Sequence, residues 1–289
     1  MNGLTRRAVL VVSALAIALG MTTVVRAEST LDKIKSTGEM TAGVAIYDTW
    51  AFRRENGEVA GFSPDLIKAA FEPLGVKKFN FVLVEWGALV PSLQTHRFDL
   101  IAAGMWITPA RCEMVAFSDP DVLINDAALV KKGNPNNIHS YEDVAKNPNL
   151  RIGAGRGSAA LEHARMAGIP DDRILQFQDE DAASAALFAG RIDAQPLGST
   201  SIGRVLKDPN SSAIIESATP FTGFIAKDGY EVAGRSAIAF RLDDKELRDV
   251  YNKRLAELKA DGTVAALMKK YELNAKIDDR GTAERACKG

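Results

Sequence analysis

The fold is decided by the stretch Phe79-Asn-Phe-Val-Leu-Val-Glu85, which alternates as a β-strand, and by the two segments that follow it. Residues 87–96 have the apolar spacing of a helix, and Asp99-Leu-Ile-Ala-Ala-Gly104 is typical of a short buried strand. Upstream, residues 40–47 are an expected strand, and Ser63-Pro64 marks the start of a helix. This β-α-β-α-β order predicts a mainly parallel sheet with helices on its faces, and ligands bind beyond the carboxyl ends of such strands.

The same alternation returns in the second half of the chain. Leu150-Arg-Ile-Gly-Ala154 is an expected strand, and a helix, a strand, a helix and a strand follow at residues 158–167, 174–177, 182–190 and 192–195. The 289 residues are 46% hydrophobic and 25% charged, which suits two cores of about 100 to 150 residues each. We therefore predict an α/β protein of two lobes.

Two extended segments are expected to cross between the lobes. The first is Ala127-Ala-Leu-Val130, and the second is Arg235-Ser-Ala-Ile-Ala-Phe240. Helices expected at residues 245–261 and 263–271 follow the second segment, so they should pack back on the first lobe. The predicted division is residues 28–127 and 239–289 for lobe 1 and residues 128–238 for lobe 2.

The N-terminus has the features of an export signal. Arg6 and Arg7 precede an uncharged run that ends at Val25-Arg26-Ala27, a small-x-small cleavage pattern. We interpret residues 1–27 as a signal peptide and expect a periplasmic product. An uncleaved anchor is the alternative, since a run of about 18 apolar residues is just long enough to span a bilayer. The paired arginines leave both the Sec and the Tat route open.

Charge and cysteine content limit the partners and the cross-links. Without residues 1–27 the chain carries 33 basic and 37 acidic residues, a net charge of −4, so we expect no nucleic-acid partner. The two cysteines, Cys112 and Cys287, permit one disulfide in an oxidising compartment, and it would tie the tail to the middle of the chain. Two unpaired thiols are the alternative, because spacing alone does not bring them within bonding distance.

Several motifs resemble those of a known transport family. They include Arg97-Phe-Asp-Leu-Ile-Ala-Ala-Gly104, Thr108-Pro-Ala-Arg111 and Phe117-Ser-Asp-Pro120. The chain resembles the polar-amino-acid family (family 3) of ABC-transporter solute-binding proteins over essentially its whole mature length. Within that family it most resembles the branch that binds ectoine and hydroxyectoine, through Trp86-Gly-Ala-Leu89, Arg111-Cys112 and the terminal Cys287-Lys-Gly289.

The resemblance implies a fold and a set of partners. The implied fold is the type II periplasmic-binding-protein fold, in which two crossing strands let the lobes close on a ligand. We place the hinge near Ala128 and Ala237. The implied partners are a small zwitterionic ligand and the permease of an ABC transporter, and we expect a monomer that uses no cofactor or metal.

The resemblance also implies a carboxylate clamp. In the family the Arg of the Thr-x-x-Arg motif grips the ligand carboxylate, and here that residue is Arg111; a planar guanidinium offers a bidentate fork for this task. A surface arginine on a turn is the alternative. Backbone groups near Gly104 and the Thr108 hydroxyl would complete the clamp. From the second lobe, the loop that ends at Gly157 and Ser158 precedes a helix and offers free N–H groups, unless its glycines serve only a tight turn.

Three aromatic residues are expected to enclose the cationic part of the ligand. Trp86, Trp106 and Phe52 stand where the ectoine-binding branch carries aromatic rings. Each ring face adds about 0.5 to 2 kcal/mol to cation binding, most when water is excluded. Core packing is the alternative for each ring, although Trp86 and Trp106 both follow the end of an expected strand.

Two departures from the family pattern leave the ligand open. Amino-acid binders carry an Asp after the Gly-Arg-x-Asp-Ala segment, whereas here Asp193-Ala is followed by Gln195-Pro-Leu-Gly198, so the partner of an α-ammonium is missing. Thr49 stands where the ectoine-binding branch has a Glu, with Asp48 one residue away. The expected ligand is therefore ectoine or hydroxyectoine, with a quaternary betaine or a polar amino acid as the alternatives.

An enzyme on the same scaffold is the main rival class. Periplasmic dehydratases resemble these binders, but catalysis needs a positioned acid or base in the cleft. His96, His139 and His163 are scattered along the sequence without the spacing of metal ligands. We therefore expect a binding protein without catalytic residues.

Overall fold

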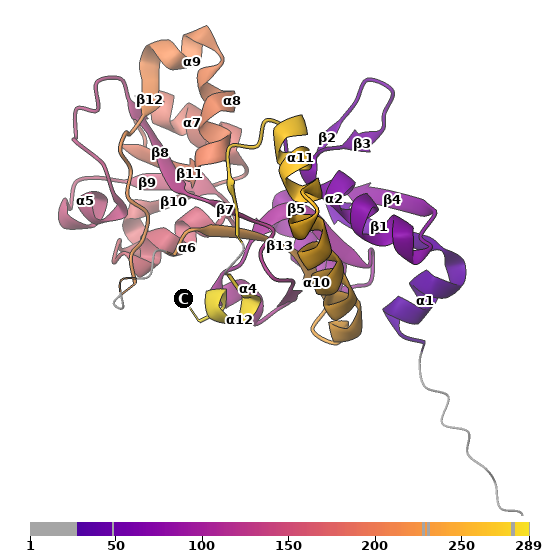
Figure 1. Cartoon of the computed structure of the whole chain (residues 1–289). Coiled ribbons are helices and arrows are strands. Elements are labelled where there is room, and N and C mark those ends of the chain that lie inside the picture. The colour runs from indigo at the N-terminus through magenta and orange to yellow at the C-terminus, as the bar shows by residue number, and fades with distance from the viewer. Residues whose placement is uncertain (1–27, 48, 227–228, 230–231, 279–280, 289) are drawn as a thin grey trace, which may run out of the picture.

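The computed structural model describes residues 28–288 except Asp48 and residues 227–228, 230–231 and 279–280. Within that part, two large β-sheets form the centres of two lobes (Figure 1). The expected signal peptide, residues 1–27, lies outside the described residues. None of the described helices combines the length and the apolar character needed to cross a bilayer.

The first lobe is built on a seven-stranded sheet. Its strands are β1 (Glu39–Val44), β4 (Lys78–Leu83), β5 (Leu100–Trp106), β6 (Ala116–Phe117), β7 (Val122–Ile124), β13 (Gly234–Phe240) and β14 (Lys276–Ile277). The order is β14-β7-β13-β5-β1-β4, and β6 pairs with β13. The other elements of this lobe are α1 (Thr30–Thr37), the hairpin β2 (Phe52–Arg53) and β3 (Val59–Ala60), α2 (Phe62–Phe71), η1 (Glu72–Leu74), η2 (Trp86–Ala88), α3 (Leu89–Gln94), α4 (Pro109–Cys112), α10 (Lys245–Ala260), α11 (Thr263–Lys270) and α12 (Ala283–Ala286).

The second lobe is built on a five-stranded sheet of order β10-β9-β11-β8-β12. Its strands are β8 (Asp126–Lys131), β9 (Ile152–Gly155), β10 (Ile174–Phe177), β11 (Ala194–Gly198) and β12 (Ile215–Ser217). Its helices are α5 (Tyr141–Lys146), α6 (Ala159–Met166), η3 (Asp171–Arg173), α7 (Glu180–Phe188), α8 (Ser199–Leu206) and α9 (Pro209–Ile214).

Both sheets are mixed rather than mainly parallel. The parallel units expected from the alternation are present, since β1 pairs in parallel with β4 and β5, and β9 pairs in parallel with β10 and β11. The strands that join the two lobes add antiparallel pairs, because β13 runs against β5 and β8 runs against β11. The α/β class and the two-lobed architecture are confirmed, while the sheets are less uniform than predicted.

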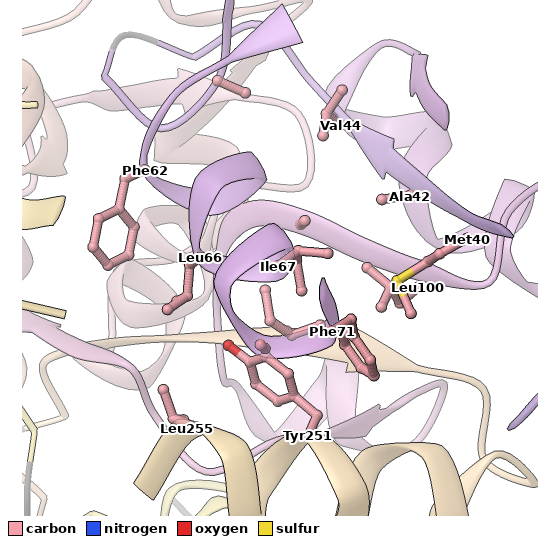
Figure 2. Packing of buried hydrophobic residues seen from close by; sticks show 14 of the residues in the cluster. Met40, Ala42, Val44, Phe62, Leu66, Ile67, Phe71, Leu100, Tyr251 and Leu255 are labelled. Carbon is pink, nitrogen blue, oxygen red and sulfur yellow. The ribbon is translucent and has the colours of Figure 1, made fainter. Parts of the chain in front are cut away.

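The first-lobe core contains residues from both the N-terminal and the C-terminal part of the described chain. Figure 2 shows Leu66 and Phe71 of α2 facing Tyr251 and Leu255 of α10, and the rings of Phe71 and Tyr251 stack with centroids 6.0 Å apart. All four side chains are fully or almost fully buried. Each such burial stabilises the fold by about 1.5 to 3 kcal/mol. The C-terminal helices therefore return to the first lobe, as the sequence predicts.

The chain passes between the two sheets at other residues than the sequence indicated. The first passage is at Asn125, between β7 and β8, and the return passage lies between β12 and β13. The expected boundaries fall inside strands instead, because Ala128 pairs with Pro196 in the second sheet and Ala237 pairs with Met105 in the first. In a sequence, an extended apolar segment that crosses between two sheets cannot be distinguished from one that lies within a sheet. These two passages are the segments that connect the sheets, and a hinge near Ala128 and Ala237 stays a prediction.

The first lobe contains the disulfide between Cys112 and Cys287. It joins the end of α4 to the residue after α12, with the two Cα atoms 5.8 Å apart across a sequence separation of 175 residues. Both half-cystines pack against the apolar cluster that includes Leu89, Phe98 and Ile107. The alternative of two unpaired thiols is thus excluded, and the C-terminus is fixed to the helix that carries Arg111.

Candidate functional site

A cavity of about 720 Å³ lies between the lobes, where strands of both sheets end. Segments after β1 and β4, the end of β5 and helix α4 line it from the first lobe. Segments after β9 and β10, the end of β11 and helix α8 line it from the second. Of the residues expected from the sequence, Trp86, Gly104, Trp106, Arg111 and Ser158 line the cavity. The charged residues of the lining are Glu85, Arg97, Arg111, Arg156, Asp179, Glu180, Asp181 and Arg204, four of each sign.

Arg111 is held on the short helix α4 by its own sequence motif. The Thr108 side chain accepts a hydrogen bond from the Arg111 N–H at 3.4 Å, and Pro109 occupies the first helical position. The guanidinium donates to the Trp106 carbonyl at 2.6 Å and, across the cleft, to the Gly157 carbonyl at 2.7 Å. Burial lowers the pKa of Arg111 to about 10, against a raising effect of Glu162, so the group stays charged at neutral pH.

Trp86 lies directly beside this guanidinium. It is the first residue of η2, immediately after the loop that follows β4, and its ring centroid is 5.8 Å from Cζ of Arg111. The indole Nε1–H donates to the same Gly157 carbonyl at 3.3 Å. One carbonyl of the second lobe thus receives two donors from the first lobe. A ligand carboxylate has two acceptor oxygens and a full negative charge, so it is a stronger acceptor for these donors than the carbonyl and can replace it.

Trp106 forms a fixed wall of the cavity. Its ring stacks on His163 of α6 with centroids 5.9 Å apart. Gly234 and Gly198 leave the space that the indole fills, since a Cβ at Gly234 would lie 2.1 Å from Cε2 of Trp106 and a Cβ at Gly198 would lie 3.0 Å from Cζ2. His163 is itself held by Asp126, with Nδ1 2.9 Å from Oδ2. The indole therefore has little freedom to move.

Backbone and hydroxyl groups complete the expected set. Gly104 has φ of +64°, and a Cβ there would lie 2.3 Å from the Trp50 indole, so the strand end requires glycine. Gly157 contributes its carbonyl as described above. Ser158 precedes α6, and its hydroxyl is buried without a hydrogen-bond partner among the described atoms. Ser158 is among the residues that line the cavity, and a serine hydroxyl can both donate and accept a hydrogen bond.

Three expected residues lie elsewhere. Phe52 belongs to the β2–β3 hairpin and packs on Tyr271 with ring centroids 6.1 Å apart, so it faces the first-lobe core rather than the cavity. Thr49 is not part of the lining, and its carbonyl accepts from the N–H of Phe62 at the start of α2. Thr108 is buried and caps α4, so it positions Arg111 without reaching the cavity. Asp48 lies outside the described residues.

A polar cluster that was not predicted from the sequence lies at another part of the cavity. Tyr47, on the loop after β1, donates from its hydroxyl to Oε1 of Glu180 at 2.7 Å and accepts from the Ser201 hydroxyl at 2.9 Å. Nη2 of Arg204 lies 3.5 Å from Oε2 of Glu180. The Tyr47 ring lies 5.6 Å from that of Trp86, and so supplies the aromatic neighbour that Phe52 does not. We name these four residues, Tyr47, Glu180, Ser201 and Arg204, the Glu180 cluster.

The Glu180 carboxylate is largely withdrawn from water. Its side chain is 16% exposed, and burial raises its pKa, against the lowering effects of Tyr47 and Arg204. In the sequence, Asp179-Glu180-Asp181 looks like an ordinary acidic start of a helix, and Asp179 does cap α7 by accepting from the Ala182 N–H. One weak indication of Glu180 in the sequence was Gln195, in the segment where the family's Asp is missing. In the structure, the Gln195 side chain donates to the backbone carbonyl of Glu180 at 3.0 Å.

A cavity between two α/β lobes, bordered by the ends of both sheets and by groups of both charges, defines a two-lobed solute-binding protein. Residues 40–274 match the family of bacterial extracellular solute-binding proteins, family 3, and the chain belongs to that family. It has the type II periplasmic-binding-protein fold with two lobes.

Individual relatives agree with this assignment. A probable amino-acid ABC transporter periplasmic-binding protein of Sinorhizobium fredii is 34% identical over 88% of this chain and 85% of its own length. Among solved structures, EhuB in complex with hydroxyectoine aligns at 32% identity over 91% of this chain and 96% of that chain, with a TM-score of 0.72. An ancestral amino-acid-binding protein, described as a precursor of cyclohexadienyl dehydratase, aligns at 32% identity over 84% and 99% of the two chains, with a TM-score of 0.69.

Proposed function

We propose that the chain is the exported solute-binding component of an ABC importer and that it captures a small zwitterion, with ectoine or hydroxyectoine as the first candidates. The observation that carries the proposal is the position of Arg111. Its buried, charged guanidinium lies in the cavity beside the Trp86 ring and donates across the cleft to a backbone carbonyl. A ligand carboxylate is the group that best satisfies such donors in a site withdrawn from water.

The cationic half of the ligand would lie against the aromatic walls. Trp86 and Trp106 both line the cavity, and Tyr47 lies beside Trp86. A delocalised or alkylated cation gains from such ring faces. A quaternary betaine and a polar amino acid share the carboxylate and are the alternative ligands. The hydroxyectoine complex of a protein of similar fold supports the first candidates.

Ligand capture would occur by lobe closure. The cleft is bridged at Arg111 and Gly157, at Tyr47 and Glu180, and between the Ala110 N–H and Glu162 at 3.4 Å. A ligand that contacts both lobes binds the closed form better and shifts the population towards it. The permease would then recognise the closed monomer in the periplasm.

Binding without chemistry is part of the proposal, although one relative of similar fold is described as a precursor of a dehydratase. None of the three histidines is among the described residues that line the cavity. Incubation of the protein with each candidate ligand, followed by mass spectrometry, checks this point. A converted product would contradict a pure binding role.

Calorimetric titration of residues 28–289 tests the function itself. The panel is ectoine, hydroxyectoine, glycine betaine, proline betaine and arginine. We expect tight binding of at least one compatible solute, with ectoine or hydroxyectoine tightest. Tight binding of arginine, with no response to the four solutes, would refute the assignment of the ligand class.

A further inference from the structure

We propose that Glu180 is a specificity-determining residue, whose carboxylate receives N–H donors from the cationic group of the ligand. This inference rests on the proposed function and deepens it, because it separates cations that carry N–H groups from quaternary ammonium. The segment in which the family's amino-acid binders carry an Asp reads Gln195-Pro-Leu-Gly198 here, and Gly198 packs against Trp106. Glu180 provides a carboxylate in the same cavity from a different element, the first turn of α7.

The geometry leaves Glu180 with fewer donors than a carboxylate accepts. Its short hydrogen bond comes from the neutral Tyr47 hydroxyl at 2.7 Å. Arg204 makes its closer contact with Asp181, at 2.9 Å, and approaches Glu180 only at 3.5 Å. A carboxylate has about four lone-pair sites for donors. Glu180 thus has room for further donors on the side of the cavity that it lines.

Withdrawal from water makes those missing donors significant. A carboxylate that is 16% exposed has lost most of its hydration, and burial raises its pKa. Inside a protein, such a group is compensated by an opposite charge together with hydrogen bonds. A quaternary ammonium supplies the charge without the hydrogen bonds, whereas an amidinium, guanidinium or primary ammonium supplies both. The cluster therefore favours a cation with N–H groups.

Neighbouring residues fix the carboxylate in this position. Gln195 is fully buried, donates to the Glu180 backbone carbonyl at 3.0 Å, and accepts from the Ser184 hydroxyl at 2.8 Å. Ser201 donates to Tyr47 at 2.9 Å, which leaves the Tyr47 proton for Glu180. Gln195 thus lies in the segment where the family's Asp is missing, and it positions Glu180, the carboxylate that we propose replaces that Asp.

The test compares E180Q with D171N in the same calorimetric titrations. Both variants remove one negative charge from the second lobe, but Asp171 lies outside the cavity lining and its side chain is 78% exposed. The probes are hydroxyectoine and arginine, whose cations carry N–H groups, and glycine betaine, whose cation does not. We expect E180Q to weaken binding of an N–H cation roughly 30-fold or more and to weaken glycine betaine much less. D171N should change each affinity by less than about threefold.

Each outcome decides a separate point. If E180Q and the unaltered protein bind an N–H cation with equal affinity, the inference is overturned and the proposed function stands. The same conclusion follows if the unaltered protein binds glycine betaine more tightly than either N–H cation. Binding of arginine alone, weakened by E180Q, supports the inference and removes ectoine as the ligand. If the unaltered protein binds no probe, the proposed function fails and the inference with it. Thermal unfolding of E180Q serves as the folding check, and we expect no loss of stability because a neutral isostere replaces a buried charge.

Discussion

The two places where the lobes meet inside the cavity differ in their chemistry. At one, Arg111 and Trp86 of the first lobe donate to a backbone carbonyl, that of Gly157. At the other, the Tyr47 hydroxyl donates to a carboxylate, that of Glu180. The first contact has a charged donor and a neutral acceptor, and the second has a neutral donor and a charged acceptor.

This difference indicates how a zwitterion would be oriented. The charged donor at Arg111 bonds across the cleft to a neutral carbonyl, that of Gly157, so it favours a carboxylate. The charged acceptor at Glu180 has a neutral hydroxyl as its closest donor, so it favours a cation. The carboxylate of the ligand would then occupy the Arg111 contact and its cation the Glu180 contact. The closed lobes are thus complementary to a molecule that carries both charges.

The largest effect is expected from R111A. Loss of the guanidinium removes the only side chain of the Thr108–Arg111 motif that lines the cavity among the described residues. The truncation of a buried charged partner costs about 2 to 5 kcal/mol, so the affinity measured by calorimetry should fall at least roughly 30-fold. Unfolding should be followed in parallel, because Arg111 also donates to the Trp106 carbonyl.

R191A is the matched control for R111A. Its guanidinium also lies over an aromatic ring, with Cζ 5.7 Å from the centroid of Phe177, but it is outside the cavity lining. We expect unchanged affinity. Full-strength binding by a folded R111A would show that the carboxylate is held somewhere else.

Removal of the disulfide should affect the Arg111 contact more than the Glu180 contact. Cys112 follows Arg111 on α4, while the Glu180 cluster is on other elements. The C112S/C287S double variant should lose about 2 to 4 kcal/mol of unfolding free energy in denaturant titration, because the unfolded chain gains freedom. Addition of reductant to the unaltered protein provides the parallel measurement. Unchanged stability in both would mean that the cross-link does not hold the tail to α4.

G234A tests the Trp106 wall. The added methyl group would lie 2.1 Å from Cε2 of the indole, so the ring or the strand has to shift. Overpacking of this kind costs about 1 to 3 kcal/mol, and we expect lower affinity as well as lower stability. G203A on α8 is the control, since its Cβ meets nothing within 4 Å and alanine favours a helix. Unchanged ligand affinity in G234A would contradict a role for Trp106 as a wall of the site.

The smallest effect is expected from Y47F. It removes the hydrogen bond from the neutral Tyr47 hydroxyl to the Glu180 carboxylate and leaves the ring beside Trp86, so the affinity for an N–H cation should fall by about 0.5 to 1.5 kcal/mol. The double variant Y47F/E180Q should lose less than the sum of the two single losses, since both changes act on one hydrogen bond. Strict additivity would mean that Tyr47 does not position Glu180.

The sequence predicted the α/β class, the two lobes and the return of the C-terminal helices, because these follow from apolar periodicity and from a family motif. It placed Trp86 and Trp106 after strand ends, where the cavity is, and the family motif assigned Arg111 to the ligand site. It did not predict the passages between sheets, since β8 and β13 are apolar and extended along their whole length. Phe52 was misplaced because a two-stranded hairpin gives no indication of which way its side chains turn. Glu180 was missed because its contact with Tyr47 joins residues 133 positions apart.

A crystal structure of residues 28–289 with hydroxyectoine is the most direct test of the central claim. We expect the ligand to lie in the cavity between the lobes, with its carboxylate on the Arg111 guanidinium in place of the Gly157 carbonyl and its ring against Trp86 and Trp106. A ligand bound outside this cavity, or a carboxylate held away from Arg111, would contradict it.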